Sequence, residues 1–289
     1  MTRSVRGLLL VIVTLGASCS DAQEHTVPLG NAEVPQAQVP VAGLVASPSE
    51  AVSLAMRVEA DVQSCMSGIG FSYETNDRDV LLQFLQFDES QFALAFGFPS
   101  QESIEAIEDL GQATLGTYEP ANGFVDDYDD AERSAWYAGL LGETGSEAEL
   151  DRSDGLTLSV PSRGCMAEGR ADGYGDASNA VALESLPSTF RNAVLARTLA
   201  LEEVVDSQQL WSECVTETGY EFASPEELAG AFARGSAPMS SNEAFVLDQE
   251  CGERSGLFRI GWNAVEESVE IEQPRFAAQI EQYRSVLDQ

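Results

Sequence analysis

The stretch Cys214-Val215-Thr216-Glu217-Thr218-Gly219-Tyr220-Glu221-Phe222 has a counterpart earlier in this chain of 289 residues, Cys65-Met66-Ser67-Gly68-Ile69-Gly70-Phe71-Ser72-Tyr73. Each copy predicts the end of a helix that carries a cysteine, followed by a glycine stop and by aromatic residues in alternation. A second cysteine follows each copy, Cys165 after the first and Cys251 after the second. The repeat predicts two related halves, at residues 48–185 and 186–289, of which the first is expanded by insertion.

The repeat also suggests how four cysteines pair. Four cysteines allow three connectivities. If the halves are related, the simplest pairing joins Cys65 to Cys165 and Cys214 to Cys251. A zinc site built from the same four residues is the alternative, but no cysteine pair has the close spacing that structural zinc sites use. We therefore expect two structural disulfides.

Helix signals extend outward from the repeat. Ser47-Pro48-Ser49-Glu50 predicts a capped helix start, and apolar residues at helical spacing follow it as far as Gly70. Further helices are expected at 103–110 (ending at Gly111), at 131–141 (ending at Gly142), over 190–205 as one helix, from Ser224, from Ser240 through Cys251, and from Pro274 to the C-terminus.

Extended segments are few. Residues 92–98 and 156–160 read as strands, and 142–154 as an exposed loop. Together these patterns predict a mainly α fold with minor β, a disulfide-stapled helical domain.

The N-terminus has the layout of an export signal. A short basic start with Arg3 and Arg6 precedes the apolar run 8–13, which is too short to span a bilayer. Gly16-Ala17-Ser18-Cys19 then resembles the lipobox of bacterial lipoproteins, although a branched apolar residue is usual at the position of Gly16. The resemblance implies a signal peptide over 1–18 and lipidation of Cys19. Residues 20–47 lack apolar periodicity and carry Pro28, Pro35 and Pro40, which predicts a flexible tether. Ordinary cleavage after Ala22 is the alternative.

The charge balance excludes some partners. The chain holds 48 acidic residues against 15 basic ones, all arginine, for a formal net charge of −33. Such a surface repels nucleic-acid phosphates and anionic headgroups, so we expect no nucleic-acid partner. A cationic or protein partner is compatible with it, as is a role in solubility alone.

Two residue types that much enzyme chemistry requires are scarce or absent. The single histidine, His25, lies just behind the signal, and there is no lysine. Histidine-dependent triads, histidine metal sites, Schiff bases and lysine-bearing phosphate loops are therefore excluded from the folded part. We nominate no catalytic residue, metal ligand or cofactor.

The densest acidic run, Asp126 to Glu132, has two interpretations. Clustered carboxylates suit calcium, but Ala131 stands where the EF-hand loop requires glycine. The alternative is an acidic run at a helix N-terminus, which the helix dipole favours. The aromatic residues beside the cysteines are likewise interpreted as packing around the disulfides rather than as a ligand platform.

The folded part resembles a group of uncharacterised secreted proteins and lipoproteins of high-GC Gram-positive bacteria. The similarity lies in Trp211-x-x-Cys214-Val215-x-x-x-Gly219-Tyr220-x-Phe222, in Asp248-x-x-Cys251 with Gly256-Leu257, and in Gly164-Cys165-x-x-x-Gly169. The resemblance implies an envelope protein with structural cysteines, and it supplies no activity.

We therefore expect an envelope-anchored, non-catalytic binding or interaction lipoprotein on the outer face of the cytoplasmic membrane, attached through its lipid, or otherwise a secreted protein. The alternative is a carboxylate-based hydrolase acting on cell-wall material, because two acids need only be close in space for such chemistry.

Overall fold

The computed structural model describes residues 41–79, 81–82, 94–116, 122–143, 145, 147–151, 157–175 and 177–288. The signal peptide expected over 1–18, Cys19 and residues 20–40 lie outside them. The described chain confirms a mainly α fold with minor β, stapled by two disulfides. Its elements in chain order are η1 (Val41–Leu44), α1 (Pro48–Gly68), α3 (Gln101–Gly116), η2 (Gly123–Asp127), α4 (Asp130–Leu141), β1 (Glu147–Asp151), β2 (Thr157–Pro161), α5 (Cys165–Tyr174), α6 (Ala177–Glu184), α7 (Leu186–Leu199), α8 (Glu202–Glu217), α9 (Pro225–Ala233), α10 (Ser241–Ser255) and α11 (Leu257–Leu287).

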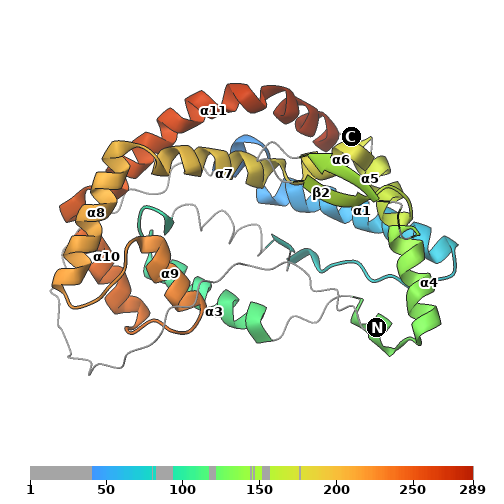
Figure 1. Cartoon of the computed structure of the whole chain (residues 1–289), viewed down its shortest axis with the longest axis horizontal. Helices are drawn as coiled ribbons and strands as arrows, with labels where there is room; N and C mark the ends of the chain where they lie inside the picture. Colours follow the sequence, from blue (N-terminus) through green and yellow to red (C-terminus); the bar gives the residue numbers. More distant parts are fainter. Residues whose placement is uncertain are drawn as a thin grey trace.

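The helices form an arch (Figure 1). The long helix α11 runs along its outer side, and α7 packs beneath it. One end of the arch holds α3, α8, α9 and α10, and the other holds α1, α4, α5 and α6 with the hairpin β1–β2. That hairpin is antiparallel, with Glu147 opposite Pro161 and Asp151 opposite Thr157. Because α7 and α11 reach both ends, they connect the two clusters.

The core runs through the whole arch. At its centre the rings of Phe190 on α7 and Phe276 on α11 meet edge to face, with centroids 5.5 Å apart. At one end Trp211 is fully buried, and at the other Val62 and Met66 are. Burial of such side chains contributes about 1.5–3 kcal/mol each, so the arch is held chiefly by apolar packing.

The predicted helix starts are confirmed where a serine or an acid caps the chain. Ser47, Asp129 and Ser240 each form a capping box with a glutamate three residues later, and Ser224 accepts from the backbone N–H of Glu227. The stop at Gly70 is also confirmed, since its φ of 92° lies in the region that side chains disfavour. Local capping chemistry therefore decides these boundaries.

Three helix predictions are wrong at their boundaries. The expected single helix over 190–205 is two, because Leu201 adopts an extended backbone (φ −73°, ψ 134°) between α7 and α8. This break turns α8 toward α10, to which it is cross-linked. Helix α3 continues through Gly111 to Gly116, and α11 continues through Pro274, so neither residue is a boundary. Tertiary packing overrides local propensity at these positions.

The segment predicted as a strand over 92–98 is not one in its described part. Leu94 is helical, Ala95 and Phe96 form a turn, and Phe98 follows in irregular backbone; residues 92 and 93 lie outside the described chain. All four apolar side chains from Leu94 to Phe98 are buried. The run of apolar residues that predicts a strand therefore reflects packing in the core, and no sheet is needed to explain it. The strand expected over 156–160 is confirmed as β2, whereas the loop expected over 142–154 contains its partner β1.

The folded part begins before Ser47, which corrects the expected extent of the tether. Val41, Val45 and Ala46 are buried, and η1 packs against α7. The Arg284 guanidinium also donates to the Leu44 carbonyl at 2.8 Å. Val41–Ser47 therefore belongs to the domain, because its apolar side chains complete the core under α7.

The two repeat copies have the same local geometry. Gln63 and Ser212 occupy equivalent positions, and each side chain donates to the carbonyl ten residues ahead, that of Tyr73 at 2.9 Å and that of Phe222 at 2.8 Å. Gly70 and Gly219 share a positive φ, 92° and 95°. The halves 48–185 and 186–289 nevertheless share one core, because α3 of the first packs on α9 and α10 of the second. Their common origin stays a prediction.

Candidate functional site

The two cysteine motifs of the second half pair with each other turn by turn. On α8, Trp211 and Cys214 lie three residues apart and face α10, where Asp248 and Cys251 have the same spacing. Trp211 Nε1 donates to Asp248 Oδ1 at 3.0 Å, and Cys214 is bonded to Cys251. A hydrogen bond and a disulfide on successive turns thus lock α8 to α10.

Asp248 also holds the segment that leads into α3. Its Oδ2 accepts from the Phe98 backbone N–H at 2.6 Å, while the neighbouring Gln249 donates to the Phe98 carbonyl at 3.0 Å. Burial raises the pKa of Asp248 to about 7, against the opposing effect of hydrogen bonds from Phe98 and Trp211. The carboxyl is therefore a buried junction between α8, α10 and the segment Leu94–Phe98.

Gly97 permits this close approach. A Cβ built at Gly97 would lie 2.9 Å from Asp248 Oδ2, and the residue has a φ of 137°. Both the space and the backbone conformation require glycine. The sequence does not mark this contact, because Gly97 lies inside a segment whose apolar pattern predicts a strand.

The first disulfide joins α1 to α5. Cys65 is bonded to Cys165, which is buried, and the Cα atoms are 5.4 Å apart, against 5.5 Å in the second bridge. This is the pairing predicted from the repeat. A Cβ at Gly169 would lie 2.8 Å from Val62 Cγ2, so the glycine allows α5 to approach α1 closely.

The aromatic residues beside the first bridge pack against the core, as predicted. Tyr73 stacks on Trp136 with ring centroids 6.3 Å apart, and Trp136 Nε1 donates to the Ser72 carbonyl at 2.9 Å. The Tyr73 hydroxyl donates to Glu59 at 3.1 Å. Burial and the charge of Glu59 raise the pKa of Tyr73, so the ring stays neutral and structural. Phe71, Tyr220 and Phe222 are half-buried against the same core.

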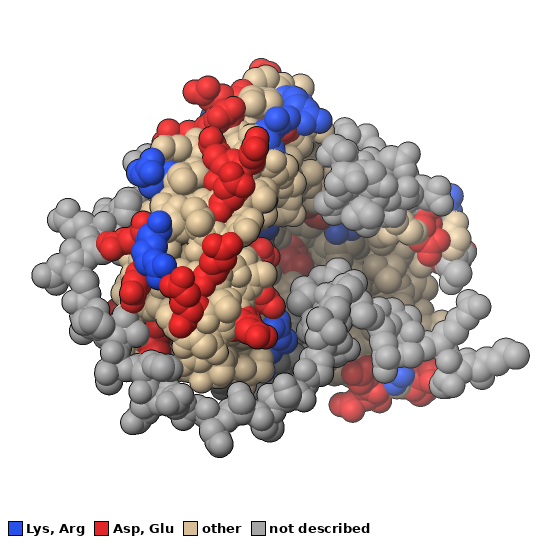
Figure 2. Space-filling view, turned by 60° about the vertical axis from the view of Figure 1, so that its left-hand side comes forward, with Lys and Arg blue, Asp and Glu red and all other residues tan. Residues whose placement is uncertain are grey.

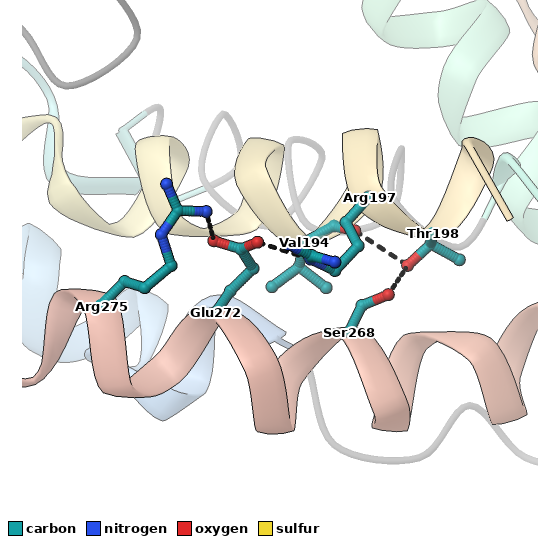
Figure 3. Close-up of polar contacts among 6 residues, drawn as sticks. All are labelled: Val194, Arg197, Thr198, Ser268, Glu272 and Arg275. Atoms are coloured by element: carbon teal, nitrogen blue, oxygen red, sulfur yellow. Dashed lines mark hydrogen bonds and ion pairs between the residues drawn. The ribbon is translucent and has the colours of Figure 1, made fainter.

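A second buried acid lies where α7 crosses α11 (Figure 3). The side chain of Glu272 is 3% exposed and accepts from Arg197 Nε and from Arg275 Nη1, each at 2.6 Å. One turn away, the Thr198 hydroxyl donates to the Val194 carbonyl at 2.8 Å and is hydrogen-bonded to the Ser268 hydroxyl at 3.0 Å. Two guanidinium groups neutralise Glu272, so its role is to hold the two long helices together.

The acidic run at 126–132 lies at a helix N-terminus, as the second interpretation proposed. Asp129 caps α4 by accepting from the backbone N–H groups of Ala131 and Glu132, both at 2.8 Å. Asp130 and Glu132 stand in the first turn, where the helix dipole favours negative charge. Among the residues that the structure describes, no group of three or more potential metal ligands is close enough to hold an ion.

The exposed face at one end of the arch is acidic (Figure 2). On α8 the acids Glu202, Asp206, Glu213 and Glu217 follow one another at helical spacing and are exposed, and the helix has no basic residue. Val205 and Leu210, 49% and 52% exposed, flank them. We call these six residues the α8 outer face.

None of the helices in the described part of the chain combines the length and the apolar character needed to cross a bilayer. Comparison of the chain with protein-family models, with curated proteins and with solved structures finds no match.

The two buried acids of the described chain therefore have structural roles. Asp248 and Glu272 are both buried and both hydrogen-bonded between helices. Sequence reasoning did not single out either one, although the matching spacing of Trp211-x-x-Cys214 and Asp248-x-x-Cys251 was a signal that the four residues face each other. The surface that remains available to a partner is strongly acidic.

Proposed function

We propose that this protein is an envelope-anchored, non-catalytic interaction lipoprotein, held on the outer face of the cytoplasmic membrane by lipid on Cys19. The proposal depends on the number of cysteines and on how they pair. The four cysteines of the described chain form two disulfides, and the sequence holds one more, Cys19, directly after an apolar leader. Paired cysteines are typical of exported proteins, and an odd one is accounted for by lipidation.

Lipidation would give firm attachment. Buried acyl carbon contributes about 0.8 kcal/mol per CH₂, and two chains suffice for stable anchoring. Residues 20–40 would then link the anchor to the folded domain, whose described part begins at Val41. Membership in the group of high-GC Gram-positive lipoproteins is part of the same proposal.

A binding role agrees with the chemistry of the described side chains. The two buried carboxylates, Asp248 and Glu272, already have structural partners, so neither nominates a catalytic pair. No observation specifically favours the alternative of a carboxylate-based hydrolase. With a net charge of −33, the surface attracts cations, cationic peptides and basic proteins.

Metabolic labelling with a fatty acid tests the anchor. The wild-type protein should take up label and sediment with membranes, whereas Cys19→Ala should do neither, because the acceptor sulfur is gone. Ser20→Ala is the matched control and should behave as wild type. Retention of label and of membrane association by Cys19→Ala would refute the anchor.

Binding of a short oligo-arginine peptide tests the acidic partner surface. Replacing the four acids of the α8 outer face by amides should weaken binding, and the effect should shrink at high salt, because exposed charges are screened. The matched control neutralises four exposed acids of α11, namely Glu266, Glu267, Glu270 and Glu281. If both variants lose affinity equally, the attraction belongs to the whole surface and the α8 outer face has no special role.

A further inference from the structure

The two acids that are buried in the described part of the chain, Asp248 and Glu272, differ in their counter-charges. Glu272 accepts from two guanidinium groups. Asp248 is 2% exposed, and its two hydrogen bonds come from uncharged donors, the Phe98 backbone N–H and Trp211 Nε1. Burial disfavours the charged form and raises the pKa of Asp248, and the two hydrogen bonds from uncharged donors offset only part of that effect.

The elements packed against Asp248 present uncharged groups to it. The segment Leu94–Phe98 contains no ionisable side chain. Helix α8 turns Trp211 inward, and its acids, which are Glu203 and the four of the α8 outer face, are exposed. Helix α11 approaches this segment through Gly261, against the Phe96 ring. Helix α3 buries Ile104 and Ile107. Of its four acids, Glu102, Glu105 and Asp109 are exposed and Glu108 is half-buried.

The charged residues of α10 itself point elsewhere. Glu243, Glu250 and Glu253 are exposed. The Arg254 guanidinium is also exposed and is engaged by Glu217 at 2.9 Å and by the Cys214 sulfur at 3.2 Å. Among the described residues, then, the charged side chains that α3, α8 and α10 carry around Asp248 are exposed, apart from the half-buried Glu108.

We propose that Asp248 forms a proton-linked latch: the segment Leu94–Phe98 docks on α8 and α10 around a neutral carboxyl and is released more often when that carboxyl ionises. A neutral carboxyl keeps its carbonyl oxygen as an acceptor for the Phe98 N–H. Release of the segment exposes Asp248 to water, where ionisation is favourable. Because Pro99 and Ser100 alone separate the segment from α3, release also loosens the start of α3.

The direction of the pH effect follows from proton binding in the two states. Burial raises the pKa of the docked carboxyl from 3.8 to about 7. Between these values the docked state binds a proton that the released state lacks, so docking weakens as pH rises through this window and levels off above it. From about pH 5 to about pH 8, one linked proton raises the equilibrium constant for release roughly 90-fold.

Amide hydrogen exchange of the segment Leu94–Phe98 tests the latch. After correction for intrinsic exchange rates, protection should fall by that factor between the two pH values. Asp248→Asn has a similar shape and cannot ionise, so its protection should not depend on pH. Amides at the α7–α11 contact serve as the internal control and should change much less. Equal changes at both places would show a global effect without a latch, and unchanged protection in the wild type would equally overturn the proposal.

Titration of the Asp248 carboxyl carbon by NMR in the wild-type protein gives a second test that needs no variant. A midpoint near 7 supports a neutral docked carboxyl. A midpoint at or below the ordinary value of 3.8 would show that the docked segment holds a charged carboxylate, and the proposal would be wrong.

Discussion

Glu272 and Asp248 are both buried acids, but their partners determine how each responds to substitution. Glu272→Gln removes the charge that neutralises Arg197 and Arg275 at the α7–α11 contact. Because breaking a buried ion pair costs about 3–5 kcal/mol and both arginines reach solvent, we expect a loss of about 2–3 kcal/mol. Urea unfolding measures it. The exposed Glu270→Gln on the same helix is the control and should change stability by less than about 0.5 kcal/mol.

Gly97 gives a second prediction at the scale of one residue. Alanine there meets both a φ of 137° and a contact of 2.9 Å with Asp248 Oδ2, so Gly97→Ala should destabilise by about 1–3 kcal/mol. Gly68→Ala is the matched control, because Gly68 ends a helix and has nothing within 4 Å of the added methyl. It should be neutral or should stabilise by up to about 1 kcal/mol. Thermal unfolding compares the two, and an equal response would contradict the proposed contact.

The sequence alone does not show that Glu272, Asp248 and Gly97 make buried contacts. Any of 48 acids could be buried, and the burial of Glu272 depends on how α7 crosses α11. The disulfide pairing, by contrast, could be predicted from the sequence, because the repeat places Cys65 and Cys214 in equivalent positions. Asp248 was marked only indirectly, through its spacing from Cys251.

At the scale of single helices, the sequence predicts where a helix starts better than it predicts where a helix breaks or continues. The caps at Ser47, Ser224 and Ser240 are local hydrogen bonds, which a short sequence specifies. The break at Leu201 and the passage of α11 through Pro274 depend instead on packing between distant segments. Local propensity therefore located the helices but not all of their boundaries.

The cap of α10 is expected to contribute measurably. Ser240→Ala removes the acceptor for the Glu243 N–H and should cost about 1 kcal/mol in urea unfolding. Hydrogen bonds from the Ser240 backbone and side chain lower the pKa of Glu243. The carboxylate's contribution is therefore present above the unfolded-state value near 4.5 and is lost as pH falls through the folded value.

The difference between wild type and Ser240→Ala should accordingly shrink in acid. Ser53→Ala is the control and should leave the pH dependence unchanged, because the exposed Ser53 hydroxyl donates to the Ser49 carbonyl at 2.7 Å. A difference that stays constant from about pH 7 to about pH 3 would contradict the role of Glu243.

At the scale of the whole molecule, each disulfide lies within one predicted half while the core is shared. A protease site inserted at the α7–α8 turn, near Ala200, should yield two fragments that separate in denaturant without reduction, because no bridge crosses that point. The same site inserted near Gly235, between Cys214 and Cys251, should give fragments that stay linked until reduced. Electrophoresis distinguishes the outcomes, and the reverse pattern would refute this connectivity.

We propose that the protein is exported and anchored by lipid at Cys19, and that its two disulfides form on export. Intact-mass analysis of protein purified from its own cells, with alkylation before and after reduction, tests it most directly. We predict a chain that begins at Cys19 with the mass of attached lipid, no alkylation before reduction, and four alkylated cysteines after it. A chain that keeps residues 1–18 and alkylates at Cys65, Cys165, Cys214 and Cys251 without reduction would contradict the account.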